Sequence, residues 1–202
     1  VTGESAQGTY TSTINQQLTN TTNIQQTIVY TVTPISGTCE GRIFTITVKV
    51  NPRATIADKT PDAICSGLSF LVSPTNGNGD IVPSGTTYKW TAVDVLGGVS
   101  GESVQGTYTS TISQQLTNTT NVQQTVIYTV TPISGNCEGG TFTVTVKVNP
   151  VATIVDKTPD AICSGATYTF NPANGNGDII PDGTIYKWTV VDLLGGVTGE
   201  SC

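Results

Sequence analysis

The sequence contains no histidine and no methionine, and only 11% of its residues are charged. Lysine and arginine together number 8 against 14 acidic residues, which gives a net charge of −6. Binding of nucleic acid needs clustered cations that displace counterions from phosphates, so this balance argues against a nucleic-acid partner. The apolar runs are only a few residues long, so we expect no membrane insertion by this sequence. Without histidine or a converging set of acidic and nucleophilic side chains, we also expect no catalytic residues and no enzyme activity.

What the sequence does have is a repeat. The segment Val1–Ser5 returns at Val99–Ser103 and begins a third time at Val197, a constant offset of 98 residues without insertion or deletion. About three quarters of the superposed positions are identical. Tandem copies of a domain-sized unit are typical of arrays that provide length, spacing and many weak contacts.

Apolar residues alternate with threonine or lysine in several short segments, which is the period-2 pattern of a strand with one buried face. The clearest are Phe142–Val148 and its copy Phe44–Val50, and Val126–Thr131 is expected to form a hairpin with Phe142–Val148. Tyr88–Val93 is expected to be a central strand that carries the only tryptophan of its unit. Two further strands are expected at Leu68–Val72 and Tyr168–Phe170. No window has a 3.6-residue apolar period over three turns, so the sequence predicts an all-β chain.

The unit boundaries are expected at Pro52 and Pro150, where proline ends the strongest strands and stiffens the chain. Residues 1–52 are then the C-terminal half of a preceding repeat, residues 53–150 a complete repeat, and residues 151–202 the N-terminal half of the next. About 98 residues with seven or more short strands, a tryptophan on a central strand and a tyrosine corner at Tyr128 resemble an immunoglobulin-like β-sandwich. Joints of a few residues restrict bending, so we expect tandem sandwiches in an elongated rod.

Four cysteines follow the repeat, with Cys39 and Cys137 at one position and Cys65 and Cys163 at the other. Two thiols per unit predict one disulfide per unit, which would join Cys65 to Cys137. Cys39 and Cys163 would then have partners outside this sequence. The two positions lie at opposite ends of a standard sandwich, so bridges between neighbouring units, or free thiols, are the alternatives. Cys202 breaks the repeat, and the sequence assigns it no role.

Two loops space oxygen-bearing side chains at i, i+2 and i+4, as a calcium loop does. These side chains are Asn76, Asn78 and Asp80, and in the next unit Asn174, Asn176 and Asp178. Neither loop continues with the glycine and distal glutamate of an EF-hand, and Asn-Gly is a common turn pair. A structural turn is therefore the preferred interpretation, with calcium as the alternative, and no other metal or cofactor is expected.

Two further features would suit a surface ligand or the fold alone. The nearly uncharged tracts Gln16–Gln26 and Gln114–Gln124 offer many hydrogen-bonding side chains for lateral contacts or polysaccharide, although a polar edge strand and loop is the preferred interpretation. Trp90 and Trp188 have the chemistry to stack on sugars, but their neighbours at strand spacing favour a core position. Asn20–Thr22 and Asn118–Thr120 also fit the N-glycosylation sequon.

A series of short motifs along the chain resembles a known family. The motifs are Ala54-Thr55-Ile56, Ala63-Ile64-Cys65-Ser66-Gly67, Tyr88-Lys89-Trp90, Tyr128-Thr129-Val130-Thr131-Pro132, Asn136-Cys137 and Val146-Lys147-Val148-Asn149-Pro150. In this order they resemble the PKD-like repeats of giant cell-surface adhesins of the Bacteroidota, including SprB-like gliding-motility adhesins, over the whole chain. After Trp90 the chain departs from ordinary PKD domains, because Thr-Ala-Val-Asp-Val-Leu-Gly-Gly stands in place of Asp-Phe-Gly-Asp-Gly.

The resemblance implies export by type IX secretion, an extracellular place at the outer-membrane surface of a bacterial cell, and a filament carried by the gliding machinery. The expected partners are neighbouring repeats of the same chain, a surface polysaccharide or the substratum, and motility or secretion machinery engaged through other regions. The sequence thus predicts a structural repeat segment of a surface adhesin, which gives reach and repeated weak adhesion. Two alternatives stay open. One is a spacer or carbohydrate-binding module of a secreted polysaccharide-degrading enzyme, and the other is a self-assembling fibre subunit completed by strands from its neighbours.

Overall fold

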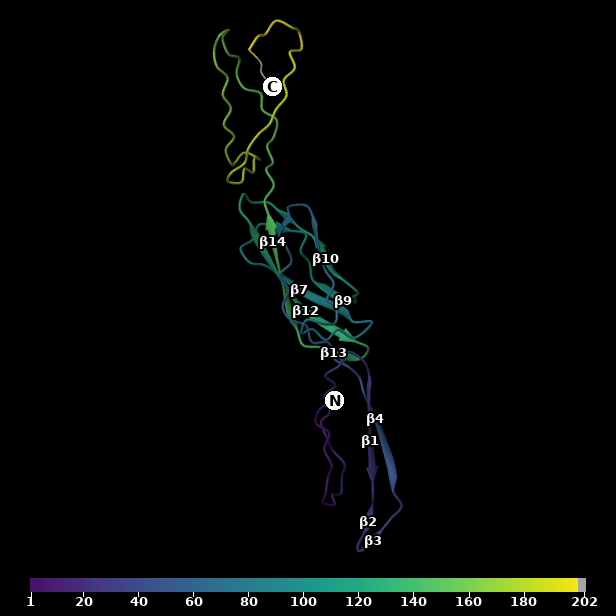
Figure 1. The fold of residues 1–202 in the computed structure, drawn as a ribbon. Coiled ribbons are helices and arrows are strands. Elements are labelled where there is room, and N and C mark those ends of the chain that lie inside the picture. Colours follow the sequence, from purple (N-terminus) through teal and green to yellow (C-terminus); the bar gives the residue numbers. More distant parts are fainter. Residues whose placement is uncertain (200–202) are drawn as a thin grey trace.

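The computed structural model describes residues 1–199, and Cys202 lies outside that part of the chain. All of its regular secondary structure is β-strand, as the sequence predicts. Figure 1 shows an elongated molecule in which residues 53–150, called here the middle unit, lie between residues 1–52 at one end and residues 151–199 at the other. Among the described residues, no helix has the length and apolar character that crossing a bilayer requires.

The largest sheet belongs to the middle unit and has the strand order β5-β14-β12-β7-β9, with the short β13 beside β12. Its strands are β5 (Ile64–Cys65), β7 (Thr87–Asp94), β9 (Gln105–Thr109), β12 (Gln124–Ser134), β13 (Cys137–Glu138) and β14 (Phe142–Asn149). The predicted hairpin is present, because β12 and β14 pair antiparallel with Val126 opposite Val146. The predicted central strand is also confirmed, because β7 lies between β12 and β9.

A second layer covers this sheet. Its strands are β6 (Ser69–Val72), which pairs with β10 (Ile112–Gln115), and β8 (Val99–Ser100), which pairs with β11 (Thr117–Asn118). Phe70 of β6 packs against Tyr128 of β12 with ring centroids 5.0 Å apart, so these strands face the large sheet. Two such layers around one apolar core form a β-sandwich.

Every buried hydrophobic side chain among the described residues lies in the middle unit. These side chains are Ala54, Ile56, Phe70, Val72, Tyr88, Trp90, Val99, Ile112, Leu116, Val126, Tyr128, Val130, Phe142, Val144, Val146 and Val148. Along β12 and β14 the buried residues occupy alternate positions, with less buried residues between them. The core is therefore built from the same alternation that predicts the strands.

The flanking segments contain fewer strands. In residues 1–52, β1 (Gln26–Val32) pairs with β4 (Phe44–Val50), and β2 (Ile35–Ser36) pairs with β3 (Cys39–Glu40). Residues 151–199 contain no strand, so the strand predicted at Tyr168–Phe170 is not formed. The equivalent strand of the middle unit, β6, pairs with β10, and residues 151–199 contain no counterpart of β10 that could supply this ladder.

Candidate functional site

The two loops with calcium-like spacing are tight turns in the structure. In the first, Gly77 and Asp80 exchange backbone hydrogen bonds of 3.0 and 2.9 Å, and Asn78 has a φ of 52°. Asparagine is one of the few residue types that adopt this left-handed conformation readily. Asn76 accepts a backbone hydrogen bond of 3.2 Å from a residue beyond the turn. The second loop places its three residues in the same way, namely Asn174, Asn176 and Asp178.

Asp80 is buried, and both of its carboxylate oxygens have protein partners. Oδ1 accepts from the Ala57 amide at 2.9 Å, and Oδ2 lies 2.6 Å from Lys59 Nζ. Burial raises the pKa of Asp80, but the hydrogen bonds from Lys59 and Ala57 and the Lys59 charge outweigh it, so the pKa is lowered. Asp178 repeats the ion pair with Lys157 at 2.7 Å. These contacts support the structural-turn interpretation of both loops.

The four cysteines in the described part of the chain are free thiols, so the predicted bridge between Cys65 and Cys137 is not formed. Cys65 is paired with Asn149, the last residue of β14, whereas Cys137 lies in β13, just before β14 begins. A strand of this length separates its two ends by about 23 Å, whereas a disulfide needs Cα atoms within about 7 Å. The number of cysteines predicted this disulfide, but the number carries no information on which end of the sandwich each thiol occupies. Bridges between neighbouring units, which would also involve Cys39 and Cys163, stay a prediction.

In the nearly uncharged tract Gln114–Gln124, the side chain of Gln114 points into the protein. Tyr128 is fully buried, and its Oη donates to Gln114 Oε1 at 3.0 Å. Gln114 also accepts from the Ser103 amide at 3.0 Å and donates to the Ser103 carbonyl at 2.9 Å. Trp90 Nε1 donates to that same carbonyl at 3.2 Å. A tyrosine corner bonds to the backbone, whereas here a glutamine side chain is the acceptor. Burial raises the pKa of Tyr128 well above its usual range, so the phenol keeps its proton as a donor.

Asn118, in the same tract, is buried and uses its whole side chain within the fold. Its Nδ2 donates to the carbonyls of Val122 and Val148 at 2.7 and 2.9 Å. Its Oδ1 accepts from the amide and hydroxyl of Thr120 at 2.9 and 2.8 Å. The amide nitrogen that a glycan would modify therefore forms hydrogen bonds inside the protein, and the role of Asn118 is structural.

The two tryptophans have different surroundings. Trp90 is 5% exposed and belongs to the core, as its neighbours in the sequence predict. Trp188 is 72% exposed in residues 151–199. The Trp90 indole is therefore part of the core, as predicted, whereas the Trp188 indole faces solvent.

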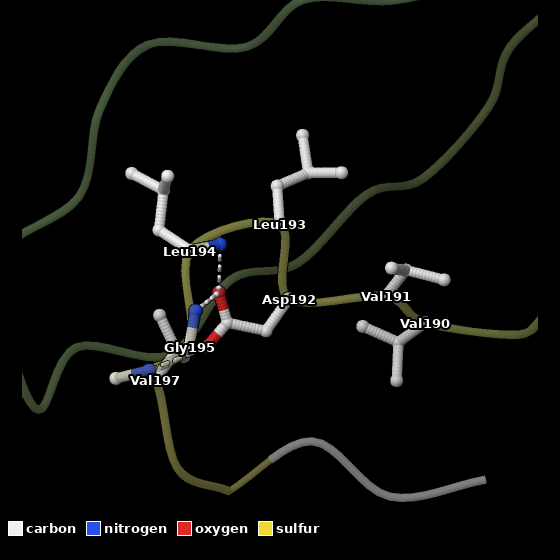
Figure 2. A pocket seen from close by; sticks show the side chains of 8 residues that line it. Val190, Val191, Asp192, Leu193, Leu194, Gly195 and Val197 are labelled. Atoms are coloured by element: carbon white, nitrogen blue, oxygen red, sulfur yellow. Dashed lines mark hydrogen bonds between the residues drawn. The ribbon is translucent and has the colours of Figure 1, made fainter.

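A hollow near the end of the described chain is lined by residues 190–197 (Figure 2). At its centre the Asp192 carboxylate accepts the backbone N–H groups of four residues at 2.7 to 3.2 Å, namely Leu194, Gly195, Gly196 and Val197. The bonds from Val197, Gly195 and Gly196 are the main cause of the lowered pKa of Asp192. The Leu193 and Leu194 side chains point away from the carboxylate. Because backbone N–H groups of the same loop already donate to the Asp192 carboxylate, we interpret the hollow as a turn that is capped by Asp192.

Strand β13 lies at the end of the middle unit that faces residues 1–52 (Figure 1), and its Glu138 belongs to a charged cluster. Glu138 of β13 accepts from Tyr108 Oη at 3.0 Å and lies 3.4 Å from Lys89 Nζ. The hydrogen bonds from Tyr108 and Lys89, with the Lys89 charge, lower the pKa of Glu138. Lys89 Nζ also lies 5.0 Å from the centre of the Tyr108 ring. Arg53, the first residue of the middle unit, donates to the Glu138 carbonyl, so the cluster ties the joint to β13.

Comparison with known proteins identifies one family. The model of the PKD-like domain family matches residues 1–54 and 62–152. No curated protein matches the chain. The matched residues contain both hairpins, β1 with β4 and β12 with β14, together with the central strand β7. Because the match covers more than half of the sequence, the chain belongs to the PKD-like domain family.

Proposed function

We propose that the chain is a structural repeat segment of a large extracellular adhesin or filament at the bacterial cell surface, of the gliding-motility adhesin type. Membership of the PKD-like family indicates an extracellular domain of structural or adhesive type. The adhesin type, the outer-membrane association and type IX export rest on the resemblance of the sequence motifs.

The observation that carries the proposal is that the repeat preserves the contacts inside the unit. The bond from Tyr128 to Gln114 recurs as a bond of 2.8 Å from Tyr30 Oη to Gln16 Oε1. Asn20 likewise repeats the buried hydrogen bonds of Asn118. A chain in which each repeat keeps the contacts that a unit needs for folding becomes longer with each added repeat.

In this role the neighbouring repeats are the structural partners of each unit. The exposed polar side chains would contribute many weak contacts with a surface polysaccharide or the substratum, which gain strength through number. The motility or secretion machinery would be engaged through other regions.

Immunogold electron microscopy of intact cells that express the gene tests this proposal, with an antibody raised against residues 53–150. We expect regular label along surface filaments, and no label on a strain from which the gene is deleted. Impaired gliding of the deletion strain would support the finer assignment. Label found only in the culture fluid would overturn the adhesin role and favour a spacer or carbohydrate-binding module of a secreted enzyme.

A further inference from the structure

The chain contains four Asn-Gly pairs, and all four belong to the two tight turns. They begin at Asn76 and Asn78 in the middle unit and at Asn174 and Asn176 in residues 151–199. Asn-Gly is the dipeptide in which the next backbone nitrogen most readily attacks an asparagine side chain, because glycine has no side chain to obstruct the approach. All four asparagines are exposed, so neither sequence nor exposure distinguishes them.

At Asn76 both reacting groups are held by hydrogen bonds. The Gly77 N–H donates to the Asp80 carbonyl at 3.0 Å. The Asn76 side-chain oxygen Oδ1 accepts from the Val82 amide at 3.2 Å. For the two groups to meet, the Gly77 nitrogen must leave its acceptor and the Asn76 side chain must leave Val82. Attack at Asn76 therefore requires two hydrogen bonds to break first.

The second turn holds its first asparagine in the same way. The Gly175 N–H donates to the Asp178 carbonyl at 3.1 Å. Asn174 Oδ1 accepts from the Ile180 amide at 2.6 Å, and Asn174 Nδ2 donates to the Ile180 carbonyl at 3.0 Å. The first asparagine of each turn is thus fixed both at its side chain and at the backbone nitrogen that follows it.

Asn78 lies at the tip of its turn, where the reacting groups are not held. Within residues 1–199, neither the Asn78 side chain nor the Gly79 N–H forms a hydrogen bond. The peptide unit between Asn78 and Gly79 can therefore rotate while the two backbone bonds that close the turn stay intact. In the same described part of the chain, the Asn176 side chain and the Gly177 N–H also form no hydrogen bond.

We propose that Asn78, and Asn176 at the equivalent position, deamidate spontaneously in the folded protein, whereas the first asparagine of each turn is protected. The Gly79 nitrogen bonds to Asn78 Cγ, and the bond from Cγ to Nδ2 breaks. Ammonia leaves with the proton of the Gly79 amide, and a five-membered succinimide ring remains. Water, the only co-reactant, then opens the ring at either carbonyl and gives aspartate or isoaspartate. No group is oxidised or reduced.

Deamidation changes both the charge and the backbone of the turn. Each turn that reacts gains one negative charge, in a chain whose net charge is already −6. Isoaspartate carries the main chain through its side-chain carbons, which lengthens the turn by one methylene group. Asp80 follows the turn directly, so this product should loosen the bonds of its carboxylate to Ala57 and Lys59. Because each turn has one reactive asparagine, the modified fraction would rise with the age of the protein.

Peptide mass spectrometry of the full chain, incubated folded at neutral pH and digested in mild acid, tests this proposal. Fragmentation by electron transfer locates each lost amide and separates isoaspartate from aspartate. We expect Asn78 to deamidate roughly ten-fold or more faster than Asn76, the factor expected when two hydrogen bonds must first break. Asn176 should exceed Asn174 in the same way. In urea, where the turns are open, the rates at Asn76 and Asn78 should converge.

Two outcomes of this comparison would overturn the proposal. One is that Asn76 and Asn78 react equally fast in the folded chain, or that Asn78 does not react there in the time in which it reacts in urea. The other is that the preference for Asn78 is the same in urea as in the folded chain, because the turn would then not be its cause.

A pair of variants assigns the added charge. Asn78→Gly removes the reactive amide, and glycine suits the left-handed φ of 52° at this position. Asn76→Ser removes the protected amide and is the matched control. Isoelectric focusing of the aged wild type should resolve two added acidic forms, for one and two modified turns. Asn78→Gly should give one of them and Asn76→Ser both.

An aged Asn78→Gly chain with the wild-type pattern would mean that the charge arises elsewhere, and would contradict the assignment. Near-ultraviolet circular dichroism checks that the middle unit remains folded in each variant. The result does not depend on the adhesin role.

Discussion

The phenol of Tyr128 donates a hydrogen bond of 3.0 Å to the side chain of Gln114, and this bond links the two layers of the sandwich. Tyr128 lies on β12 of the large sheet, and Gln114 lies on β10 of the second layer. The same pair is present in the N-terminal segment as Tyr30 and Gln16. Because a buried hydroxyl without an acceptor is costly, the pair helps to fix how the two layers meet.

Gln114→Ala should lower the free energy of unfolding by about 2 kcal/mol, because it leaves the Tyr128 hydroxyl and the Ser103 amide without their acceptor. Urea unfolding of the full chain measures the change. Gln123→Ala is the control, since Gln123 is exposed and donates only to the half-buried Asn149 side chain, and it should change stability by less than about 0.5 kcal/mol. Equal losses from the two substitutions would contradict the structural role of Gln114.

The pair of Asp80 and Lys59 predicts a loss of stability in acid. The pKa of Asp80 is lower in the folded than in the unfolded chain, so its ionised carboxylate stabilises the fold above the unfolded value of about 4. This contribution is lost as the pH falls through the folded pKa. Asp80→Asn should therefore cost about 1–3 kcal/mol at neutral pH and progressively less in acid.

Thermal unfolding of wild type and variant across the acid range measures this convergence. Asp178→Asn removes the equivalent carboxylate from residues 151–199, outside the closed core, and should leave unfolding of the middle unit unchanged. If the two pH profiles of wild type and Asp80→Asn ran parallel, Asp80 would not be the group whose titration matters.

The strands of the middle unit could be predicted because one face of each is buried in a single core. Alternation in Phe142–Val148 reports that burial directly, and it gives β14 and its hairpin partner. The same reasoning fails at Tyr168–Phe170, where the alternation is present but the pairing strand is not. A strand requires a ladder partner, and a local sequence pattern does not supply one.

The polar contacts were harder to predict than the apolar core. Gln114 and Asn118 belong to a tract that sequence reasoning places at the surface, yet their side chains bond inward. The composition of a tract is the same whether its polar side chains face water or form hydrogen bonds with buried groups. For Cys65 and Cys137 the expected fold was the better guide, because it places the two thiols at opposite ends of the sandwich, whereas their number alone favoured a bridge that is not formed.

Gly139→Ala should destabilise the joint at the start of the middle unit. A Cβ at Gly139 would meet the Ala54 carbonyl oxygen at 2.4 Å and Pro132 Cγ at 2.8 Å. Backbone must then shift at the joint, at a cost of about 1–3 kcal/mol. Gly140→Ala is the matched control, since a Cβ there meets nothing within 4 Å and its φ is not in the positive region. Differential scanning calorimetry should show a lower Tm for the first variant alone, and a lowered Tm for both would point to a general need for glycine in this loop.

Ile112→Ala and Ile14→Ala change the same residue type at equivalent repeat positions, so they separate the effect of burial from that of sequence. Ile112 is 0% exposed and Ile14 is 52% exposed. In dilute solution, Ile112→Ala should cost about 2–5 kcal/mol through the cavity that it leaves in the core, whereas Ile14→Ala should cost less than about 1 kcal/mol because its side chain is half in water. Urea unfolding of the two variants at matched low concentration measures the difference. Equal costs would mean that residues 1–52 bury Ile14 as fully as the middle unit buries Ile112, and would contradict the difference in burial between the two positions.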